Sequence, residues 1–478
     1  MFLSPTIDPN YCPRNIYTLR SYAAFISIAI SFWLIFNNIT LNRDGMLYDE
    51  TANIFLQHGL EAARANYNWP FLSVLAAVIS QVFYIDTSTA LQVITTASFL
   101  LITDFFIRIN FLTTNNIKIA TISALLILSL PAINGYRGMV IRDPGAWASM
   151  LAAIYYACLY WQQKTRPTLL LSSLLLIFVA CFFRAEFIIF SLAFPAAFLF
   201  SRRDNSSRKS AIIAAVGALL LAILLLLIFR FPEYKIAKQL STTFNLSHLL
   251  ADIHRNSDII ANKILNEFSA EYATSFYLFG LLGSFITIVV FALQPAFTLI
   301  AAIRFKLYLK TFLQSKALLV LTGLMLIPLF MQFVSTQILV ARYTGFLAIL
   351  LLFPLVHVVD HIYSERSKLK YFVGVIIAIA FLDNVISTKP NDKSYLVKSG
   401  EWVKTNHPGM SIGSNDKQTI YLATGVYNKS RPTSLERSKK DFYILIAREA
   451  PANKKHWRLV EIIDTKAKKS AYIYQRKQ

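Results

Sequence analysis

Long apolar runs follow one another along most of the chain, from the twenties to the late 380s. A helix of about 20 mainly apolar residues crosses a hydrocarbon core of about 30 Å, and most of these runs approach or reach that length. The first run, Ala23 to Ile35, is followed by Asn and Arg rather than by small residues, so we expect a retained span and not a cleaved signal peptide. The pattern predicts about eleven membrane-spanning helices, near 21–39, 88–107, 118–134, 145–161, 168–183, 185–200, 211–229, 275–303, 316–333, 340–359 and 370–388.

One apolar segment, from Pro70 to Tyr84, is only about fifteen residues long and is ambiguous. It could be a span or a helix that lies in the membrane interface. As a span it would invert the topology of everything after it and place the basic loops on the wrong side. We therefore treat it as part of the first outside loop.

Basic residues between the apolar runs set the expected orientation. With the N-terminus in the cytoplasm, the inside segments hold seventeen Lys and Arg residues, and the short outside loops hold six. This bias agrees with the excess of basic residues in cytoplasmic loops. An odd number of spans then places the loops 40–87, 134–143 and 230–275 outside, together with the tail. We expect a multi-pass protein of the bacterial inner membrane, with its site facing the periplasm or the cell exterior.

The chain changes character after Ile386, where the long apolar runs stop. Local patterns predict a short helix closed by His407-Pro408-Gly409 and a second helix over 418–424. They predict strands over 410–413, 442–447, 459–463 and 471–474. The fold class is therefore mainly α. A transmembrane domain, 1–390, precedes a soluble extracytoplasmic α/β domain, 391–478. No paired acids stand near a basic cluster in this tail, so we expect it to be an accessory domain.

Composition supports the membrane class and removes other classes. Hydrophobic residues make up 55% of the chain, charged residues only 15%, and the mean hydropathy is +0.50. A soluble domain carries about a quarter charged residues. The net charge of +21 sits mostly in short loops and in the tail, without an aromatic platform for bases, so we expect membrane lipids and no nucleic acid as partners. The three cysteines lie far apart and form neither a disulfide framework nor a metal-ligand spacing.

Two outside loops concentrate acids and bases beside the membrane. The first reads RDGMLYDETANIFLQHGLEAARANYNWP and contains Asp49 and Glu50. The second reads NGYRGMVIRDPGAW and contains Arg137, Arg142 and Asp143. A carboxylate can take a proton from a hydroxyl, and arginines can hold a phosphate through two parallel hydrogen bonds. This combination suits the transfer of a group from a lipid phosphate to a hydroxyl.

Each of these residues also has a purely structural explanation. Asp49-Glu50-Thr51 opens an amphipathic helix, where acids favour the helix dipole. Asp143-Pro144 is a good N-cap followed by proline at the first helical position. Arginines beside a membrane commonly extend to the interface. Position alone does not separate the alternatives.

Further segments accompany these acids in a fixed order. The helix that begins at Asp49 is expected to end near Gly59, before Asn68-Trp69-Pro70 and an apolar segment. An arginine-containing turn, FFRAE, covers 182–186, and we expect its Arg184 to extend to the interface near its neighbour Glu186. The remaining segments are Ala341-Arg342-Tyr343 at the outer start of the tenth span, and Glu401-Trp402-Val403-Lys404 through Gly413-Ser414-Asn415-Asp416 in the tail.

In order and spacing, these segments resemble the C-type glycosyltransferases. These are membrane enzymes that use polyprenyl-phosphate sugars, and they include the protein O-mannosyltransferases and the lipid A aminoarabinose transferases. The resemblance covers most of the chain. It departs from the family at the first-loop proline, which is single where relatives often have two. The WWDYG-type motif of oligosaccharyltransferases is absent, which argues against en bloc transfer of a glycan to asparagine.

The resemblance implies an inverting transferase that moves a hexosyl or pentosyl group from a polyprenyl-phosphate donor to a hydroxyl of a glycan, lipid or protein acceptor on the extracytoplasmic face. Asp49 corresponds to the general base, Asp143 to a second active-site acid, and Glu50 to a neighbour that could replace Asp49. The candidates for the donor phosphate are Arg137, Arg142 and Arg342. No cofactor is certain, and a divalent metal ion held by Asp49, Glu50 and Asp143 is an open alternative.

Two other functions remain as alternatives. A transporter or flippase of lipid-linked sugars predicts internal repeats, broken spans and charges deep in the helices, of which the sequence shows few. An O-antigen ligase or polymerase would carry its functional arginines and histidine in the large 230–275 loop. In a transferase, that loop could instead close over the donor.

Overall fold

The computed structural model describes residues 14–38, 40–163, 167–192, 217, 246–365, 368–386, 393–427, 434–449, 456–464 and 469–477. Three predicted regions lie outside these residues: the span 211–229 apart from residue 217, the second half of the span 185–200, and the first part of the 230–275 loop. The chain divides into two compact units. The first unit comprises Met1–Ile28, Ser98–Gly135 and Arg142–Asn384, and the second comprises Ala29–Ala97, Tyr136–Ile141 and Val385–Gln478.

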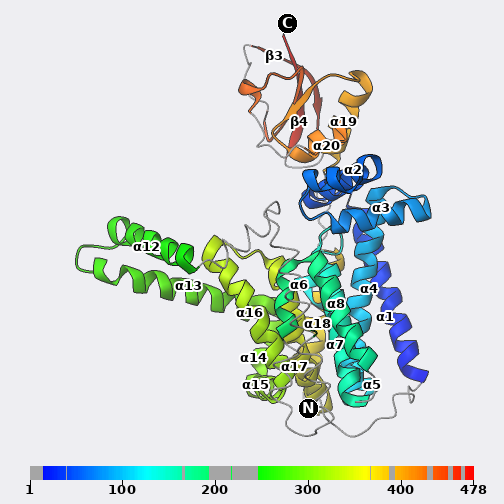
Figure 1. The fold of residues 1–478 in the computed structure, drawn as a ribbon, viewed down its shortest axis with the longest axis vertical. Coiled ribbons are helices and arrows are strands. Elements are labelled where there is room, and N and C mark those ends of the chain that lie inside the picture. The colour runs from blue at the N-terminus through cyan, green and yellow to red at the C-terminus, as the bar shows by residue number, and fades with distance from the viewer. Residues whose placement is uncertain are drawn as a thin grey trace. The chain divides into compact units, whose positions relative to one another are not determined.

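The first unit is built of helices (Figure 1). At its centre lies α17 (Gly345–Ser364), which is apolar on nearly all sides and almost entirely buried, as expected for a helix surrounded by other helices. It packs against α5, α15 and α16, among others. The other elements are α5 (Ile117–Ser129), α6 (Pro131–Asn134), α7 (Asp143–Gln163), α8 (Pro167–Phe183), η1 (Ala185–Leu192), α12 (Leu246–Lys263), η2 (Ala270–Tyr272), α13 (Ala273–Val290), η3 (Phe291–Leu293), α14 (Gln294–Ile303), α15 (Phe305–Gln314), α16 (Lys316–Thr336) and η4 (Ala341–Thr344). Three further helices contribute residues to both units: α1 (Arg14–Asn37), α4 (Thr87–Thr114) and α18 (Leu369–Ile386).

The predicted apolar runs form helices wherever the structure describes them. By length and composition, six helices of the described chain could cross a membrane: Asn15–Asn37, Thr87–Thr114, Ala270–Ile303, Lys316–Thr336, Ala341–Ser364 and Leu369–Ile386. The mainly helical fold is thus confirmed, whereas the count of eleven spans stays a prediction. The ambiguous segment forms α3 (Phe71–Phe83), whose 13 residues reach only about 20 Å and fall short of a hydrocarbon core.

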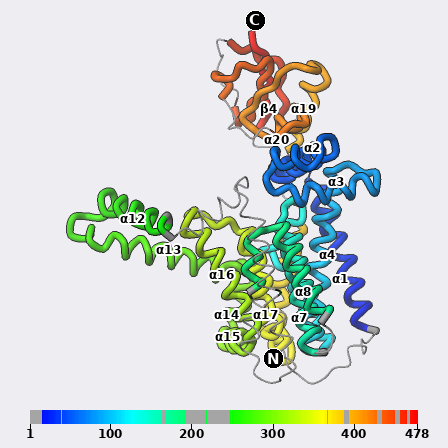
Figure 2. Tube along the Cα trace, viewed as in Figure 1, coloured from blue at the N-terminus to red at the C-terminus, as the bar shows by residue number. Residues whose placement is uncertain are grey.

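The second unit joins the first predicted outside loop to the tail. The loop supplies α2 (Arg43–Asn66) and α3, and α2 packs against α20 (Lys417–Thr424) of the tail. Figure 2 shows this neighbourhood, with the orange part of the tail beside the blue α2. Within α2 the backbone breaks at Gly59, whose φ of 78° is a left-handed conformation that glycine adopts without strain. The break falls at the helix end that the sequence predicts.

The tail forms the predicted small α/β module. Its helix α19 (Ser394–Asn406) begins earlier than expected, and it precedes β1 (Ile412–Ser414), α20, η5 (Leu435–Arg437), β2 (Phe442–Ala447), β3 (Trp457–Ile463) and β4 (Ser470–Arg476). The sheet order is β1-β2-β4-β3, with β1 parallel to β2 and the other pairs antiparallel. Alternate residues of β2 face opposite sides, because side chains along a strand have a period of two. Phe442 and Ile444 pack with α19, and Tyr443 packs with Trp457 on the other side.

Candidate functional site

Asp49 lies on α2, well inside the helix. It is the seventh residue of a helix that begins at Arg43, so it is beyond the first turn, where free N–H groups and the dipole favour an acid. Its side chain is buried, with the residue only 7% exposed. The helix-dipole explanation from the sequence is therefore wrong for Asp49, and its burial needs another cause.

Two hydroxyl groups donate hydrogen bonds to the Asp49 carboxylate. Thr87, at the start of α4, donates from Oγ1 to Oδ1 at 2.5 Å. Tyr421, on α20, donates its phenolic hydroxyl to Oδ2. Within the described part of the chain, no Lys, Arg or His forms an ion pair with Asp49. This buried carboxylate is thus held by neutral hydroxyls rather than by a cation.

The environment keeps the Tyr421 hydroxyl protonated. Burial raises the pKa of Tyr421 well above its ordinary value, and the neighbouring negative charge of Asp49 raises it further. A phenol with a raised pKa is a hydrogen-bond donor at neutral pH. The carboxylate of Asp49 therefore faces a protonated hydroxyl group, that of Tyr421, from the tail.

Glu50, beside Asp49 in sequence, is held by N–H donors. Its Oε1 accepts from the backbone N–H of Tyr427 at 3.0 Å, and its Oε2 accepts from Nδ2 of Asn66 at 3.2 Å. Tyr427 reaches Glu50 because α20 ends at Gly425, whose φ of 74° turns the chain after the helix. α20 and the residues that follow it thus contact both Asp49 and Glu50 of α2.

Two polar contacts, made by Asp416 and Gln418, dock α20 beside these acids. Asp416 caps the helix by accepting from the N–H of Gln418 at 2.8 Å, and its other oxygen lies 3.4 Å from the guanidinium of Arg43. Gln418 also donates to the carbonyl of Leu41 at 2.9 Å. These contacts between the tail and the first loop were not predictable from the sequence, because they join residues more than 370 positions apart.

Arg137, also in the second unit, is fully buried. It donates to the hydroxyl of Ser31 at 3.0 Å and borders a small cavity, together with Thr40, Gln92 and Thr95. Burial lowers the pKa of Arg137 to about 9, so the guanidinium still carries its charge at neutral pH. A buried cation of this kind suits an anionic ligand.

The second acidic position, Asp143, lies in the first unit and forms part of an ion-pair cluster. Asp143 opens α7 and bonds to Arg184, which also bonds to Glu186. The Arg184 side chain is only 10% exposed, so this arginine does not extend to the interface as the sequence suggested. Its guanidinium lies 4.5 Å from the ring centre of Tyr343.

Two of the predicted phosphate ligands lie near this cluster. The guanidinium carbon of Arg342 is 5.3 Å from the ring centre of Tyr343, on which Arg184 also stacks. Arg142 interacts electrostatically with Glu186. Three arginines against the two acids Asp143 and Glu186 leave one net positive charge, which favours an anion.

A small cavity opens beside the cluster. Tight backbone packing shapes it. A Cβ on Gly345 would come within 2.5 Å of the Trp147 ring, and one on Gly145 would come within 2.6 Å of the Phe183 ring. The residues around the cavity are Asp143, Trp147, Arg184, Glu186, Phe187, Met325, Pro328, Leu329, Gln332 and Tyr343.

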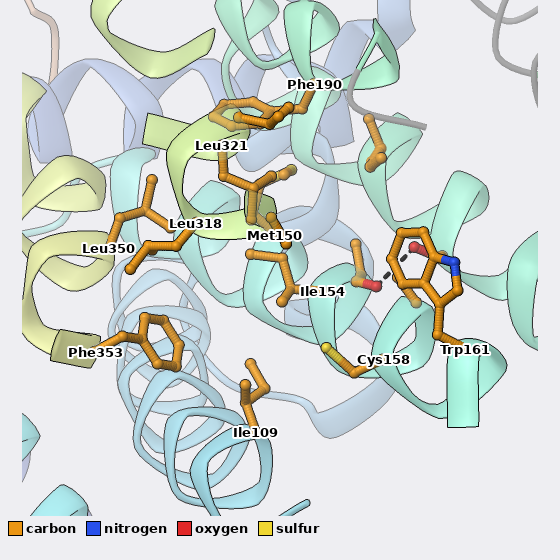
Figure 3. Close-up of a pocket in the computed structure, with 16 residues that line it drawn as sticks. Ile109, Met150, Ile154, Cys158, Trp161, Phe190, Leu318, Leu321, Leu350 and Phe353 are labelled. Carbon is orange, nitrogen blue, oxygen red and sulfur yellow. Dashed lines mark hydrogen bonds between the residues drawn. The ribbon is translucent and has the colours of Figure 1, made fainter. Parts of the chain in front are cut away.

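A larger cavity in the first unit carries no charged group (Figure 3). It lies among side chains of α7, α8, α16 and α17, such as Met150, Leu321 and Phe353. The hydroxyl of Ser173 at its wall donates to the carbonyl of Ala153 at 2.6 Å and is thus occupied. This cavity suits hydrocarbon and not the chemistry of group transfer.

The described residues do not form a metal site. Among them, no three His, Cys, Asp or Glu side chains gather in a way that could hold an ion. Asp49 and Glu50 share the second unit with Arg137, whereas Asp143 belongs to the first unit with Arg142 and Arg342.

The comparison with known proteins rests on structure. No protein-family model matches the sequence, and no curated protein sequence is significantly similar to it. The fold is similar to that of ArnT from Cupriavidus metallidurans bound to undecaprenyl phosphate, with a TM-score of 0.59 and 10% identity over 97% of this chain and 98% of that chain. The chain has the fold of ArnT. The expected C-type fold is thereby confirmed.

A second likeness is partial. The Archaeoglobus fulgidus oligosaccharyltransferase, solved tethered to an acceptor peptide containing the NVT sequon, gives a TM-score of 0.51 and 15% identity over 88% of this chain. The chain spans only 61% of the length of that protein. At these identities the comparisons concern the fold.

Proposed function

We propose that this protein is an inverting membrane glycosyltransferase that moves a sugar from a polyprenyl phosphate to a hydroxyl of a glycan, lipid or protein. The observation that carries the proposal is the environment of Asp49. Its buried carboxylate accepts from hydroxyl groups and has no cation beside it among the described residues. A carboxylate in such a place can take the proton of a hydroxyl nucleophile.

In the proposed reaction, Asp49 removes the proton of the acceptor hydroxyl. The acceptor oxygen attacks the anomeric carbon of the sugar and forms the new C–O bond. The bond from that carbon to the phosphate oxygen breaks, and polyprenyl phosphate leaves with the electron pair. Attack opposite the leaving group inverts the configuration of the anomeric carbon.

The leaving phosphate carries negative charge that arginines can stabilise. We assign this role to the arginines that the sequence suggests, Arg137, Arg142 and Arg342. The cluster around Arg184 carries one net positive charge, which supports the assignment. Asp143 remains the second acid of the site, and its bond to Arg184 orders the cluster. Glu50 remains the neighbour that could replace Asp49.

The proposal includes eleven spans, an extracytoplasmic site and, for a bacterial protein, a place in the inner membrane. The charge bias of the loops supports this orientation. Single cysteines at the exposed positions Ala65 and Lys404 should react with a membrane-impermeant maleimide in intact cells, and a cysteine at Asn115 should not. Labelling of the Asn115 variant before lysis would reverse the topology.

The test of the function is turnover by the full chain in lipid nanodiscs. Polyprenyl phosphates that carry single hexoses or pentoses would be incubated with the protein, and the free polyprenyl phosphate would be measured by mass spectrometry. We expect release from at least one donor, and loss of that release in the Asp49→Asn variant. A flippase would instead move intact donor across a liposome bilayer. Translocation without any cleavage would therefore favour the transporter.

A further inference from the structure

The contact between Tyr421 and Asp49 has a consequence for how an acceptor enters. Tyr421 places a protonated O–H on the carboxylate that, under the proposed function, takes a proton from an acceptor O–H. Both hydroxyls need the same kind of hydrogen bond to the same group. We propose that Tyr421 holds the acceptor's position on Asp49 and that the acceptor must displace it. This inference rests on the proposed function and assigns the tail a role in acceptor selection.

The two hydroxyls on Asp49 are not equivalent. Thr87 is 5% exposed and belongs to α4, a long apolar helix, so its bond to Oδ1 is part of the packed interior. Tyr421 is only partly buried and comes from α20, a helix of 8 residues. An acceptor that approaches Asp49 therefore meets Tyr421, because Tyr421 is the more accessible of the two donors.

The contacts that hold α20 against α2 are weak enough for α20 to be released. Its ion pair, between Asp416 and Arg43, spans 3.4 Å, and the Arg43 side chain is 62% exposed. Exposed pairs of this kind contribute little to stability, and salt screens them. The helix carries its own caps at Asp416 and Gly425, so it can leave α2 without unfolding.

The test uses Tyr421→Phe, which removes the hydroxyl and keeps the ring. Simple acceptors, water and methanol, would be used with the donor that the wild-type protein cleaves. A hydrogen bond to a charged group corresponds to a factor of roughly ten in an equilibrium constant. The Tyr421 hydroxyl should therefore weaken the binding of a competing acceptor hydroxyl to Asp49 by roughly that factor. We therefore expect the rate constants for hydrolysis and methanolysis to rise by about that factor, with the donor KM unchanged.

Thr87→Val is the matched control, because it removes the other hydroxyl from the same carboxylate. Loss of either donor removes one hydrogen bond from Asp49, but only the loss of Tyr421 opens the acceptor's position. An equal rise in both variants would overturn the inference, as would a fall in Tyr421→Phe. If the wild-type protein cleaves no donor, or if Asp49→Asn cleaves it normally, the proposed function itself fails.

A second measurement does not depend on turnover. A water-soluble carbodiimide with an amine probe modifies accessible carboxyl groups, and peptide mass spectrometry reports the extent at Asp49. We expect severalfold faster modification of Asp49 in Tyr421→Phe than in the wild type or in Thr87→Val. Equal modification in all three would show that the tail does not cover the carboxylate.

Discussion

Replacement of Asp49 by asparagine separates chemistry from structure at the candidate base. Asparagine has the same shape, so one oxygen still accepts from Thr87 or Tyr421, and the new amide can donate to the other hydroxyl oxygen. The exchange replaces charge-assisted hydrogen bonds by neutral ones, at a cost on the order of 1 kcal/mol. It also removes a buried charge that has no cationic partner among the described residues, which offsets that cost.

The effect on catalysis should be much larger. Loss of a general base lowers a rate by about 100- to 10,000-fold, which is about 2.7–5.4 kcal/mol of activation free energy. We therefore expect Asp49→Asn to show a melting temperature within a few degrees of the wild type, an unchanged donor KM and a kcat reduced by at least 100-fold. The assay is release of polyprenyl phosphate in nanodiscs, with thermal unfolding followed in parallel.

The matched control is Asp44→Asn, the same change five positions earlier on α2, in the first turn of the helix. It should keep near-normal turnover, because Asp44 is not the proposed base. Normal turnover in Asp49→Asn would refute the reasoning and move the role to Glu50 or Asp143. A large fall in melting temperature would show instead that the Asp49 charge is structural.

Three further predictions concern other parts of the molecule. Arg342→Lys keeps the charge and loses the two parallel N–H donors, so the donor KM should rise by about tenfold with little change in kcat; an unchanged KM would assign Arg342 to packing. Gly345→Ala forces the Trp147 ring to move, which should lower stability by about 1–3 kcal/mol in thermal unfolding, whereas an unaltered melting temperature would show that the ring moves freely. Asp441 accepts from the N–H and the hydroxyl of Ser411, which lowers its pKa, so its contribution to stability is present above about pH 4 and is lost as the pH falls through the folded pKa. Proteolysis of the tail in the full chain should become faster in that acidic window, and Asp441→Asn should remove this part of the pH dependence.

Much of the fold follows from local patterns in the sequence. The apolar run expected over 316–333 forms α16 (Lys316–Thr336), and the strand expected over 442–447 is β2. Such elements are predictable because hydrophobic length and period-two alternation are properties of adjacent residues. The C-type fold was also predictable, from the order of several weak motifs. The start of α2 was not, since Asn42 makes no side-chain cap and no local signal marks the boundary.

The partners of the candidate acids were beyond local patterns. Tyr421 is 372 positions from Asp49 in sequence, and Arg184 is 41 positions from Asp143. Contacts at such separations depend on tertiary packing, which periodicity does not encode. The sequence therefore identified Asp49 and Asp143 but not the groups that hold them. For Arg184, only the nearby Glu186 could be recognised as a partner from the sequence, so an interfacial position was expected instead of the ion pair with Asp143.

These partners distinguish the two acids chemically. Asp143 is ion-paired with the guanidinium of Arg184, so its carboxylate is already held by a charged partner. Asp49 instead accepts from two neutral hydroxyls, and such bonds can be exchanged for a bond to another hydroxyl. Asp49 is therefore better suited to take a proton from an acceptor alcohol, and Asp143 is better suited to balance charge around a phosphate. We propose that two carboxylates that look alike in the sequence have different roles, because their hydrogen-bond partners differ.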